Sequence, residues 1–412
     1  MHTNNPDVVV VGAGIAGASI AAILARGGLE VLLLERQRAY RDRVRGEYMA
    51  HWGVLEARAA GLETAMRGKH AVDVRYRVPY DEMLTPAAAE MAKRDNSTVF
   101  PDVLGPLCAS HPEACQALTD EAVSLGAELV RGVTGVRVQA GPRPSMAYRN
   151  GTEVQLRPRL IIGADGRTST VRAQSGIHLK KAPASHVITG LLVEGASRWP
   201  ADQYSIGVEG DLQFYVFPQG GGRLRLYTCH ASEQAARWAG RAGPQRFLQA
   251  FAGLRSVPAA LGLGDVTAAG PCATFSGEQT WCDQPYADGV VLAGDAGGYD
   301  DPVDGQGLSL AMRDARQLSE LLLATGDWTV AGLAPYGQQR AERLRRMRRV
   351  SRTFAALMTD FTAEGRARRS RYYAASQAGS DDVGMALGAI WAGPDRLPIE
   401  AFSDQLHESL LA

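Results

Sequence analysis

Three glycines near the start of the chain have the spacing of a phosphate-binding turn. Gly12, Gly14 and Gly17 lie in VVVVGAGIAGAS, between a valine-rich segment and a segment with helical periodicity. In a strand–turn–helix unit the first glycine permits a tight turn, the second lets the backbone approach a pyrophosphate, and the third lets the helix pack closely on the sheet. Because the helix start also offers unpaired N–H groups to phosphates, the motif predicts dinucleotide binding.

An acidic residue lies where such a nucleotide would place its ribose. Glu35 ends a second apolar segment, 30–35, and follows Gly17 by 18 residues. A carboxylate at the end of the second strand of a βαβ unit accepts hydrogen bonds from the adenosine ribose. Both strands, the helix 15–26 and the terminal acid make this signal specific for a dinucleotide, but they do not distinguish NAD from FAD.

Two further aspartates follow apolar runs typical of buried strands. In LIIGADGRTSTVR, 160–172, Asp165 and Gly166 follow the strand. They could form a ligand-binding turn or an ordinary turn between a strand and a helix. In GVVLAGDAGGYDDPVDGQGLSLAMRDA, 289–315, Asp295 could accept hydrogen bonds from sugar-like hydroxyls. The Gly-Gln-Gly of 305–307 opens a helix whose N–H groups and dipole suit a ring atom that becomes negative on reduction.

The secondary structure that must position these residues differs between the beginning, the middle and the end of the chain. The buried strands that we expect first are 7–12, 30–35, 160–163 and 289–294, and the helices are 15–26 and 114–124. The middle of the chain predicts a separate antiparallel sheet of strands 188–194, 204–209, 212–217 and 223–229, with a hairpin turn at 219–222. After Val303 the pattern is mostly helical. We predict an α/β fold: a doubly wound Rossmann-like domain, an inserted antiparallel-sheet domain and a helical C-terminal part.

Composition excludes several classes of protein. The chain has 412 residues, 45% hydrophobic and 21% charged, as expected of two or three globular domains. The 44 basic and 44 acidic residues balance, without the basic surplus of a nucleic-acid-binding protein. Five cysteines without CxxC spacing indicate neither a disulfide framework nor a metal site. The uncharged run 8–25 is interrupted by glycines and has no basic residue before it, so we expect a cytoplasmic protein without a membrane partner.

The segment 340–371 carries eleven arginines and three acids. Its apolar residues have helical spacing, which predicts one long helix with a packed apolar face and with arginines solvated or paired to acids elsewhere. A patch for a membrane or a nucleic acid is the alternative interpretation. The apolar positions are Leu344, Met347, Val350, Phe354, Leu357 and Phe361.

With its three motifs in this order, the chain resembles the single-component FAD-dependent aromatic monooxygenases of the para-hydroxybenzoate hydroxylase type, over about residues 7–345. The resemblance implies that the glycine turn holds the FAD pyrophosphate, that Asp165 serves the FAD and nicotinamide region, and that Asp295 binds the ribityl chain. The segment YVFPQGGGRLRLY, 215–227, is similar to the sheet that covers the substrate in that family. The cofactor-binding residues so implied are Gly12, Gly14, Ala16, Gly17, Glu35, Arg36, Arg45, His111, Asp165, Asp295, Pro302, Gly305, Gln306, Gly307 and Leu308.

Three positions depart from the family pattern. Gly298 stands where a histidine is common, Ser309 where an asparagine is usual, and His111 where an arginine often begins a helix. We expect FAD binding to persist because it rests on many contacts, and any difference to fall on substrate handling near 298–301.

The resemblance also implies the reaction. NADPH or NADH would reduce the FAD, and a peroxyflavin would hydroxylate or epoxidise an electron-rich aromatic, phenolic or polyketide-like small molecule using O2. The protein would supply a dry pocket, orientation and a base. The candidate catalytic residues are Tyr215, Asp300 and Pro302, with Arg225, His230 and His51 as further pocket candidates. The plainer alternatives are a solvated loop acid for Asp300 and structural roles for the two histidines.

Three other functions are compatible with a dinucleotide-binding fold. A flavin-dependent halogenase would carry a Trp-x-Trp-x-Ile-Pro motif, and no two tryptophans here are two positions apart. An FAD-dependent reductase or desaturase acting on an isoprenoid or quinone-like substrate is the main alternative, and a non-enzymatic flavin-binding protein is another. The expected assembly is a monomer or homodimer. The predicted domains are an FAD-binding domain of 1–78, 97–180 and 270–345, a substrate-binding domain of 79–96 and 181–269, and a helical region of 346–412.

Overall fold

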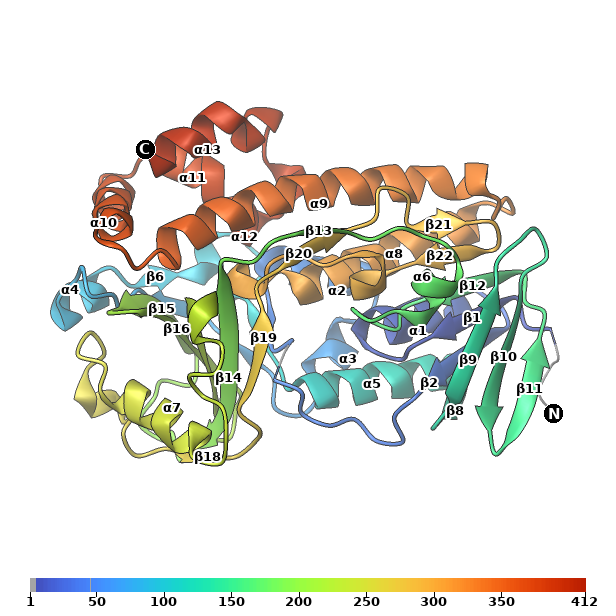
Figure 1. Cartoon of the computed structure of the whole chain (residues 1–412), viewed down its shortest axis with the longest axis horizontal. Helices are drawn as coiled ribbons and strands as arrows, with labels where there is room; N and C mark the ends of the chain where they lie inside the picture. The colour runs from blue at the N-terminus through green and yellow to red at the C-terminus, as the bar shows by residue number, and fades with distance from the viewer. Residues whose placement is uncertain (1–4, 45) are drawn as a thin grey trace.

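The computed structural model of the chain describes residues 5–44 and 46–412. Two parts, each built on a sheet, lie side by side, and the long helix α9 (Val330–Met358) runs along the top of both (Figure 1). The first part carries the glycine turn, and the second carries the antiparallel strands. The predicted α/β fold is confirmed, with parallel and antiparallel sheets and a helical C-terminal part.

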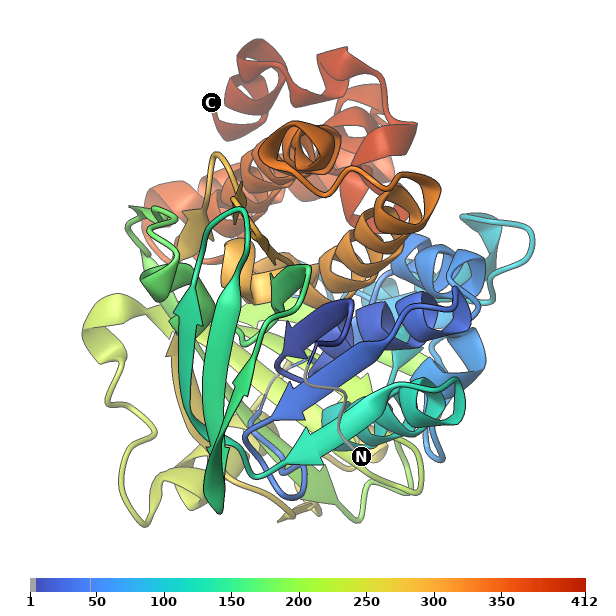
Figure 2. The same cartoon turned by 90° about the vertical axis from the view of Figure 1, so that its right-hand side faces the viewer.

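The first part is built on a six-stranded sheet in the order β21-β22-β12-β1-β2-β8, in which β21 alone among these strands runs antiparallel to its neighbour. Its strands are β1 (Val8–Val11), β2 (Val31–Glu35), β8 (Glu128–Arg131), β12 (Leu160–Gly163), β21 (Tyr286–Ala287) and β22 (Val290–Leu292). One face packs on helices α1 (Ile15–Arg26), α5 (His111–Ser124) and α8 (Gly307–Ala324). The other packs on a meander of β9 (Thr134–Gln139), β10 (Ser145–Asn150) and β11 (Thr152–Leu156), seen in Figure 2.

Burial on both faces explains the sequence of the central strand. In β1, Val8 and Val10 face the helices, whereas Val9 and Val11 face the meander. A parallel strand covered on both sides needs a continuous apolar run rather than alternation.

The second part is a mainly antiparallel sheet in the order β18-β14-β17-β16-β15-β5-β6, with β19 also paired to β14. Its strands are β5 (Tyr76–Val78), β6 (Arg94–Asp95), β14 (His186–Glu194), β15 (Gln203–Glu209), β16 (Leu212–Pro218), β17 (Leu224–Ala231), β18 (Thr267–Ala268) and β19 (Ala273–Ser276). Strands β5 and β19 belong to this sheet, although the boundaries predicted above put them in the FAD-binding domain. We propose that 76–78 and 273–276 be counted with the substrate-binding domain.

Alternation along β16 divides its side chains between two cores. Tyr215 and Phe217 face the same core as Tyr204, whereas Phe214 and Val216 face the core beneath α7 (Gly243–Ala252). Alternate side chains of this strand therefore point to opposite faces of the sheet.

The arginine-rich segment is not one helix, so that prediction is wrong. Helix α9 ends at Met358, and α10 (Ala363–Gln377) starts after a turn. The turn forms because Asp360 accepts hydrogen bonds from the backbone and hydroxyl of Thr362, whose own oxygen caps α10 at Gly365. The predicted pairing of its arginines with acids elsewhere is confirmed, because Arg340 and Arg343 pair with Asp314 and Arg369 pairs with Glu82.

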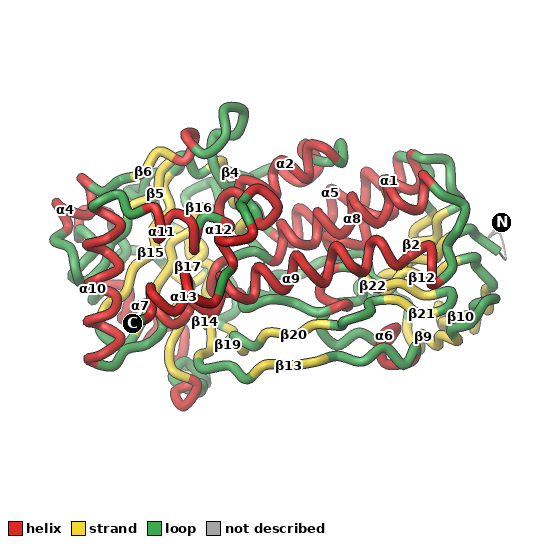
Figure 3. The backbone as a smooth tube through the Cα atoms, turned by 90° about the horizontal axis from the view of Figure 1, so that it is seen from above, coloured by secondary structure: helices red, strands yellow, loops and turns green. Residues whose placement is uncertain are grey.

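Figure 3 shows α1, α8 and α9 side by side, with the C-terminal helices gathered over the antiparallel sheet. Among the described residues no helix is long and apolar enough to cross a membrane. The cysteines are free, and the described part of the chain has no cluster of metal-ligating side chains. The remaining elements are α2 (His51–Ala59), α3 (Glu63–Arg67), α4 (Pro86–Met91), α6 (Thr170–Gln174), α11 (Asp381–Leu387), α12 (Ala389–Ala392), α13 (Asp404–Leu411), β3 (Tyr48–Met49), β4 (Val72–Asp73), β7 (Leu107–Cys108), β13 (Lys180–Ala182) and β20 (Gln279–Trp281).

Candidate functional site

A cavity of about 560 Å³ is lined by both parts of the molecule. Its first end lies at the carboxyl ends of the parallel strands, where α/β proteins bind nucleotides. Its second end is lined by aromatic residues of the antiparallel sheet and of the C-terminal helices. The lining residues at the first end include Gly12, Gly14, Ala16, Glu35, Arg36, Asp165 and Asp295, and those at the second include Tyr204, Tyr215, Phe217, Tyr372 and Trp391.

The glycine turn is shaped by close backbone packing on one side and open space on the other. A Cβ atom on Gly12, whose φ is +99°, would lie 2.5 Å from the carbonyl oxygen of Ala164. A Cβ atom on Gly17 would lie 1.9 Å from the carbonyl oxygen of Gly12. A Cβ atom on Gly14 would have nothing within 4 Å. The turn therefore packs tightly on the next strand and leaves room at Gly14 for a ligand's phosphates.

Glu35 ties this turn to the end of β2. One carboxylate oxygen accepts a hydrogen bond from the Ala13 backbone N–H at 2.9 Å, and the other accepts from Gln37 at 2.7 Å. The carboxylate oxygens keep further lone pairs for ligand hydroxyls. The arrangement therefore holds an acceptor at the rim of the cavity in a fixed position.

Asp295 lies in a short 3-10 turn, Gly294–Gly297, that follows β22. Its carboxylate faces the Arg167 guanidinium, with Nε to Oδ2 at 3.4 Å. Asp165 is used differently, because it accepts hydrogen bonds from the backbone of Thr170 and Val171 at the start of α6. Both residues line the cavity, but Asp165 has a structural partner for its carboxylate.

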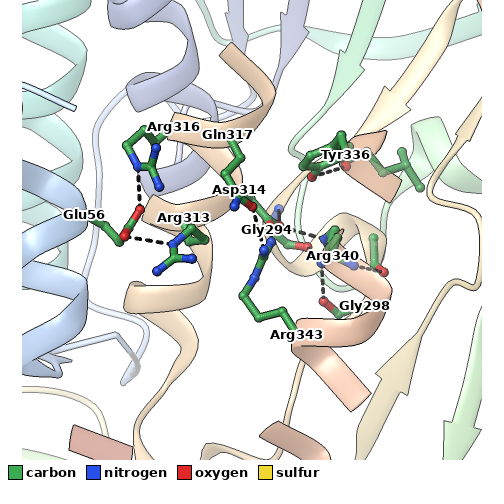
Figure 4. Close-up of polar contacts among 12 residues, drawn as sticks. Glu56, Gly294, Gly298, Arg313, Asp314, Arg316, Gln317, Tyr336, Arg340 and Arg343 are labelled. Carbon is green, nitrogen blue, oxygen red and sulfur yellow. Dashed lines mark hydrogen bonds and ion pairs between the residues drawn. The ribbon is translucent and has the colours of Figure 1, made fainter. Parts of the chain in front are cut away.

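The turn that carries Asp295 is held from behind by a buried arginine (Figure 4). Arg340 of α9 donates to the carbonyl oxygens of Gly294, Gly297 and Gly298 at 2.7–2.9 Å. Its Nε donates to Asp314 of α8 at 2.8 Å, and the same Asp314 oxygen accepts from the Gly294 backbone at 2.9 Å. Arg340 and Asp314 therefore fix the turn's backbone through a closed set of charged hydrogen bonds.

Figure 4 also shows a second carboxylate shared by arginines, between α2 and α8. Glu56 forms ion pairs with Arg313 and Arg316, at N–O distances of 2.8 and 2.7 Å. On the other side Asp314 also pairs with Arg343. These pairs attach α2, α8 and α9 to one another behind the cavity wall.

Three polar groups form a cluster at the cavity wall near Pro302. The Ser351 hydroxyl oxygen lies 2.8 Å from an Asp300 oxygen and 2.6 Å from an Asp304 oxygen. A hydroxyl has a single proton to donate, so two ionised carboxylates cannot both be satisfied by it. Burial raises the pKa of the Asp300 carboxyl, and burial together with the charge of Asp300 raises the pKa of Asp304. Both carboxyls therefore keep their protonated forms to a higher pH than exposed carboxyls do.

Tyr215 lines the cavity, but its hydroxyl is already engaged. It donates to the Val303 carbonyl oxygen and accepts from Gln213 at 2.8 Å. Burial raises its pKa well above the usual range, so it stays protonated at neutral pH. Tyr215 thus anchors the loop that carries Pro302, which also lines the cavity.

Some sequence candidates lie away from the cavity lining. His51 is fully buried and hydrogen-bonds the Asn96 carbonyl oxygen, and burial lowers its pKa to about 4. His230 is buried beside Trp238, and burial lowers its pKa to about 4. Arg225 forms ion pairs with Asp42 and Glu47. None of these three lines the cavity, so their proposed places in the pocket are not supported.

Of the remaining cofactor-binding candidates, some line the cavity and others do not. His111, Pro302, Gly305, Gly307 and Leu308 line the cavity. The side chain of Gln306 is buried elsewhere, where it accepts from the Trp52 indole at 2.9 Å and donates to the Asp304 carbonyl. Arg45 lies outside the described residues. For Gln306 and Gly17, which do not line the cavity, a direct cofactor contact stays a prediction.

Several residues of the second end were not predicted from the sequence. Tyr372 of α10, Trp391 of α12 and Arg77 of β5 line the cavity. They come from segments with no recognisable motif, and their place depends on how distant parts of the chain pack. Aromatic residues next to an arginine, in 371–373 and 76–80, were the available signal.

Comparison with known proteins finds one family model and two kinds of similar enzyme. A sequence model of the family described as FAD binding domain matches residues 5–351. The chain is similar to a rifampicin monooxygenase of Rhodococcus hoagii, at 29% identity over 353 residues, which are 80% of this chain and 66% of that protein. It thus spans just under two thirds of that relative. It is also similar to a digeranylgeranylglycerophospholipid reductase of Methanothrix thermoacetophila, at 26% identity over 343 residues, covering 80% of this chain and 81% of the reductase.

A solved structure shows the same fold. The p-nitrophenol 4-monooxygenase PnpA from Pseudomonas putida DLL-E4 matches with a TM-score of 0.80 at 19% identity, covering 96% of this chain and 100% of PnpA. The likeness therefore includes the C-terminal helices beyond residue 351.

Proposed function

The chain belongs to the FAD binding domain family, and we propose that it is an FAD- and NAD(P)H-dependent monooxygenase of electron-rich aromatic, phenolic or polyketide-like small molecules. The observation that carries this proposal is the cavity itself. It joins a dinucleotide-type turn, at Gly12 and Gly14, to an end lined by Tyr204, Phe217 and other aromatic residues. An enzyme of this kind needs its cofactor and a flat substrate in one enclosed space.

The residues at the first end fit FAD. The space at Gly14 and the fixed carboxylate of Glu35 suit a pyrophosphate and a ribose, and Asp295 suits the ribityl hydroxyls. When bound, FAD would accept hydride from NAD(P)H and activate O2. The protein's own part is to bind and orient the cofactor and to exclude water around the substrate.

Asp300 is the proposed proton acceptor for the substrate hydroxyl. It lines the cavity and belongs to the cluster with Ser351 and Asp304. A buried carboxyl with a raised pKa is a stronger base, once ionised, than an exposed carboxylate. Removing the hydroxyl proton makes a phenol or enol more electron-rich, which favours oxygen transfer to its carbon skeleton.

We expect one oxygen atom of the product to come from O2. The test incubates the FAD-loaded protein with NAD(P)H, ¹⁸O2 and the compound that most accelerates NAD(P)H oxidation in a screen of phenols, quinols and polyketide-like molecules. Mass spectrometry of the product should show one ¹⁸O atom for each NAD(P)H consumed. Running the same reaction in H2¹⁸O with unlabelled O2 controls for exchange with water.

A reductase is the second candidate, because a digeranylgeranylglycerophospholipid reductase is among the similar proteins. A product that carries no label and has gained two hydrogen atoms for one NAD(P)H would establish this alternative instead. Retention of activity without oxygen would point the same way.

Valine at Gly307 should interfere with the cofactor while leaving the fold intact. Gly307 begins α8 and lines the cavity, and a Cβ atom there would have nothing within 4 Å. A branched side chain should therefore project into the space proposed for the flavin ring and slow its reduction. The measurement is the rate of anaerobic flavin bleaching by NAD(P)H, with FAD affinity and the melting temperature of the apo-protein beside it. Normal reduction together with normal FAD affinity would remove Gly307 from the cofactor site.

A further inference from the structure

Within the described chain, a half-buried arginine at the second end of the cavity, Arg77, lacks the carboxylate partner that the fully buried arginines have. Arg225 pairs with Asp42 at 2.7 Å, Arg340 with Asp314 at 2.8 Å, and Arg369 with Glu82 at 2.8 Å. Arg77 lines the cavity, and its Nε is buried without a hydrogen-bond partner among the described residues. No ion pair joins Arg77 to a carboxylate in that part of the chain. A guanidinium that is partly removed from water and has no counter-charge is destabilising, so the position of Arg77 suits an external anion.

The surroundings of Arg77 are aromatic rather than acidic. Its guanidinium lies over the Trp391 ring at 4.7 Å from the centroid. Burial lowers the pKa of its guanidinium, whereas interactions with Tyr204, Tyr372, Tyr48 and Tyr373 raise it. Tyrosines stay neutral near pH 7, so they leave the positive charge uncompensated.

A second arginine strengthens the positive charge at the same place. Arg94 of β6 is directly opposite Arg77 of β5, and Tyr204 of β15 is opposite Arg77 on its other side. Arg94 also lines the cavity, and no ion pair or hydrogen bond of its side chain is found in the described structure. Two like charges side by side on a sheet are unfavourable unless something negative joins them.

The same wall offers a flat apolar surface next to these charges. The Tyr204 and Phe217 rings are stacked, with centroids 5.8 Å apart and an interplanar angle of 25°. Planar rings pack on such a surface, and a guanidinium next to it can hold an oxygen anion through two parallel N–H bonds. Tyr372 and Trp391 close this region from α10 and α12, beyond residue 351, where the family match ends.

We propose that Arg77 and Arg94 form a subsite that selects substrates carrying an anionic oxygen group on a planar ring system, either a carboxylate or an ionised enol. This inference deepens the proposed function and rests on it. Arg77 is the specificity-determining residue, because it lies against the rings, and Arg94 contributes charge at the rim. The subsite makes the acid–base state of the substrate part of its recognition.

Binding to the oxidised, FAD-saturated protein tests the subsite without turnover. Two matched pairs of probes serve in isothermal titration calorimetry: 2-naphthoate against 2-naphthamide, and 2-hydroxy-1,4-naphthoquinone against its 2-methoxy ether. In each pair the ring is the same and the first member alone is an anion at neutral pH. We expect the anion of at least one pair to bind about tenfold more tightly than its neutral partner, and the responding pair distinguishes carboxylate from enolate.

Variants assign that preference to the arginines. Arg77→Gln should abolish the preference for the anion, and Arg94→Gln, at an exposed position, should reduce it. Arg371→Gln is the matched control, because Arg371 of α10 is exposed, donates to the Ala412 carbonyl and does not line the cavity. Equal affinity for both members of both pairs, no binding of any probe at millimolar concentration, or a preference that survives both Arg77→Gln and Arg94→Gln would overturn the subsite. Since NAD(P)H and oxygen take no part, these outcomes are independent of the labelled-oxygen experiment.

Discussion

Replacing Arg340 with methionine should lower the free energy of unfolding by about 3–5 kcal/mol, the usual effect of removing one partner of a buried ion pair. The side chain is almost fully buried, and its loss leaves three carbonyl oxygens and part of the Asp314 charge without their donors. Methionine fills a similar volume, so the loss is mainly one of hydrogen bonds and charge. The measurement is guanidinium-induced unfolding of the apo-protein, followed by circular dichroism.

The same variant tests whether Arg340 positions the cofactor site. Because Arg340 holds the turn that carries Asp295, FAD should bind more weakly and protect the variant less against heat than it protects the wild type. Arg345→Met on the same helix is the control: Arg345 pairs with Glu342 at the surface, and its loss should cost less than about 1 kcal/mol. A destabilised variant with unchanged FAD affinity would give Arg340 a purely structural role. A loss of stability no larger than that of the control would contradict both expectations.

The fold followed from the sequence wherever local signals agreed with tertiary packing. The helix 15–26, the valine-rich strand and the four strands of the antiparallel sheet were predicted because period, turn residues and burial all point the same way. The arginine-rich helix was predicted too long because apolar spacing continues to Phe361 across the turn at Asp360. An Asp and a Thr two residues apart were the available signal for that break.

The cofactor end of the site was easier to predict than the substrate end. Glycine turns and strand-terminal acids are local motifs, and the resemblance built on them is confirmed by the family match. Arg340 contacts the turn of Asp295 from 45 residues away, and Arg77 contacts Trp391 through tertiary packing. Neither contact can be predicted from a local sequence pattern. His51 and His230 are candidates by residue type alone, which does not reveal that both are buried away from the cavity.

Replacing Asp300 with asparagine should lower the rate of product formation by about 10²- to 10⁴-fold at neutral pH, the usual contribution of a general base. Asparagine keeps the size of the side chain, and its oxygen can still accept from Gln279 and from the Asp301 backbone, as the carboxylate does at 2.8 and 2.9 Å. The fold should therefore be preserved while the proton acceptor is lost. The measurement is kcat with the substrate found in the screen, from pH 5 to 10.

The pH profile separates this role from a structural one. Burial raises the pKa of Asp300, so its basic form accumulates as pH rises, and wild-type activity should increase across that raised pKa. In Asp300→Asn this limb should disappear, and activity should recover only where the substrate hydroxyl ionises by itself in solution. Asp301→Asn is the control: Asp301 pairs with His186 and does not line the cavity, and its charge contributes to the raised pKa of Asp300. In Asp301→Asn the rising limb of the pH–activity profile should move to lower pH, and the maximal rate should be largely kept. An Asp300→Asn enzyme with the wild-type profile, or one that alkaline pH fails to rescue, would exclude Asp300 as the acceptor of the substrate proton.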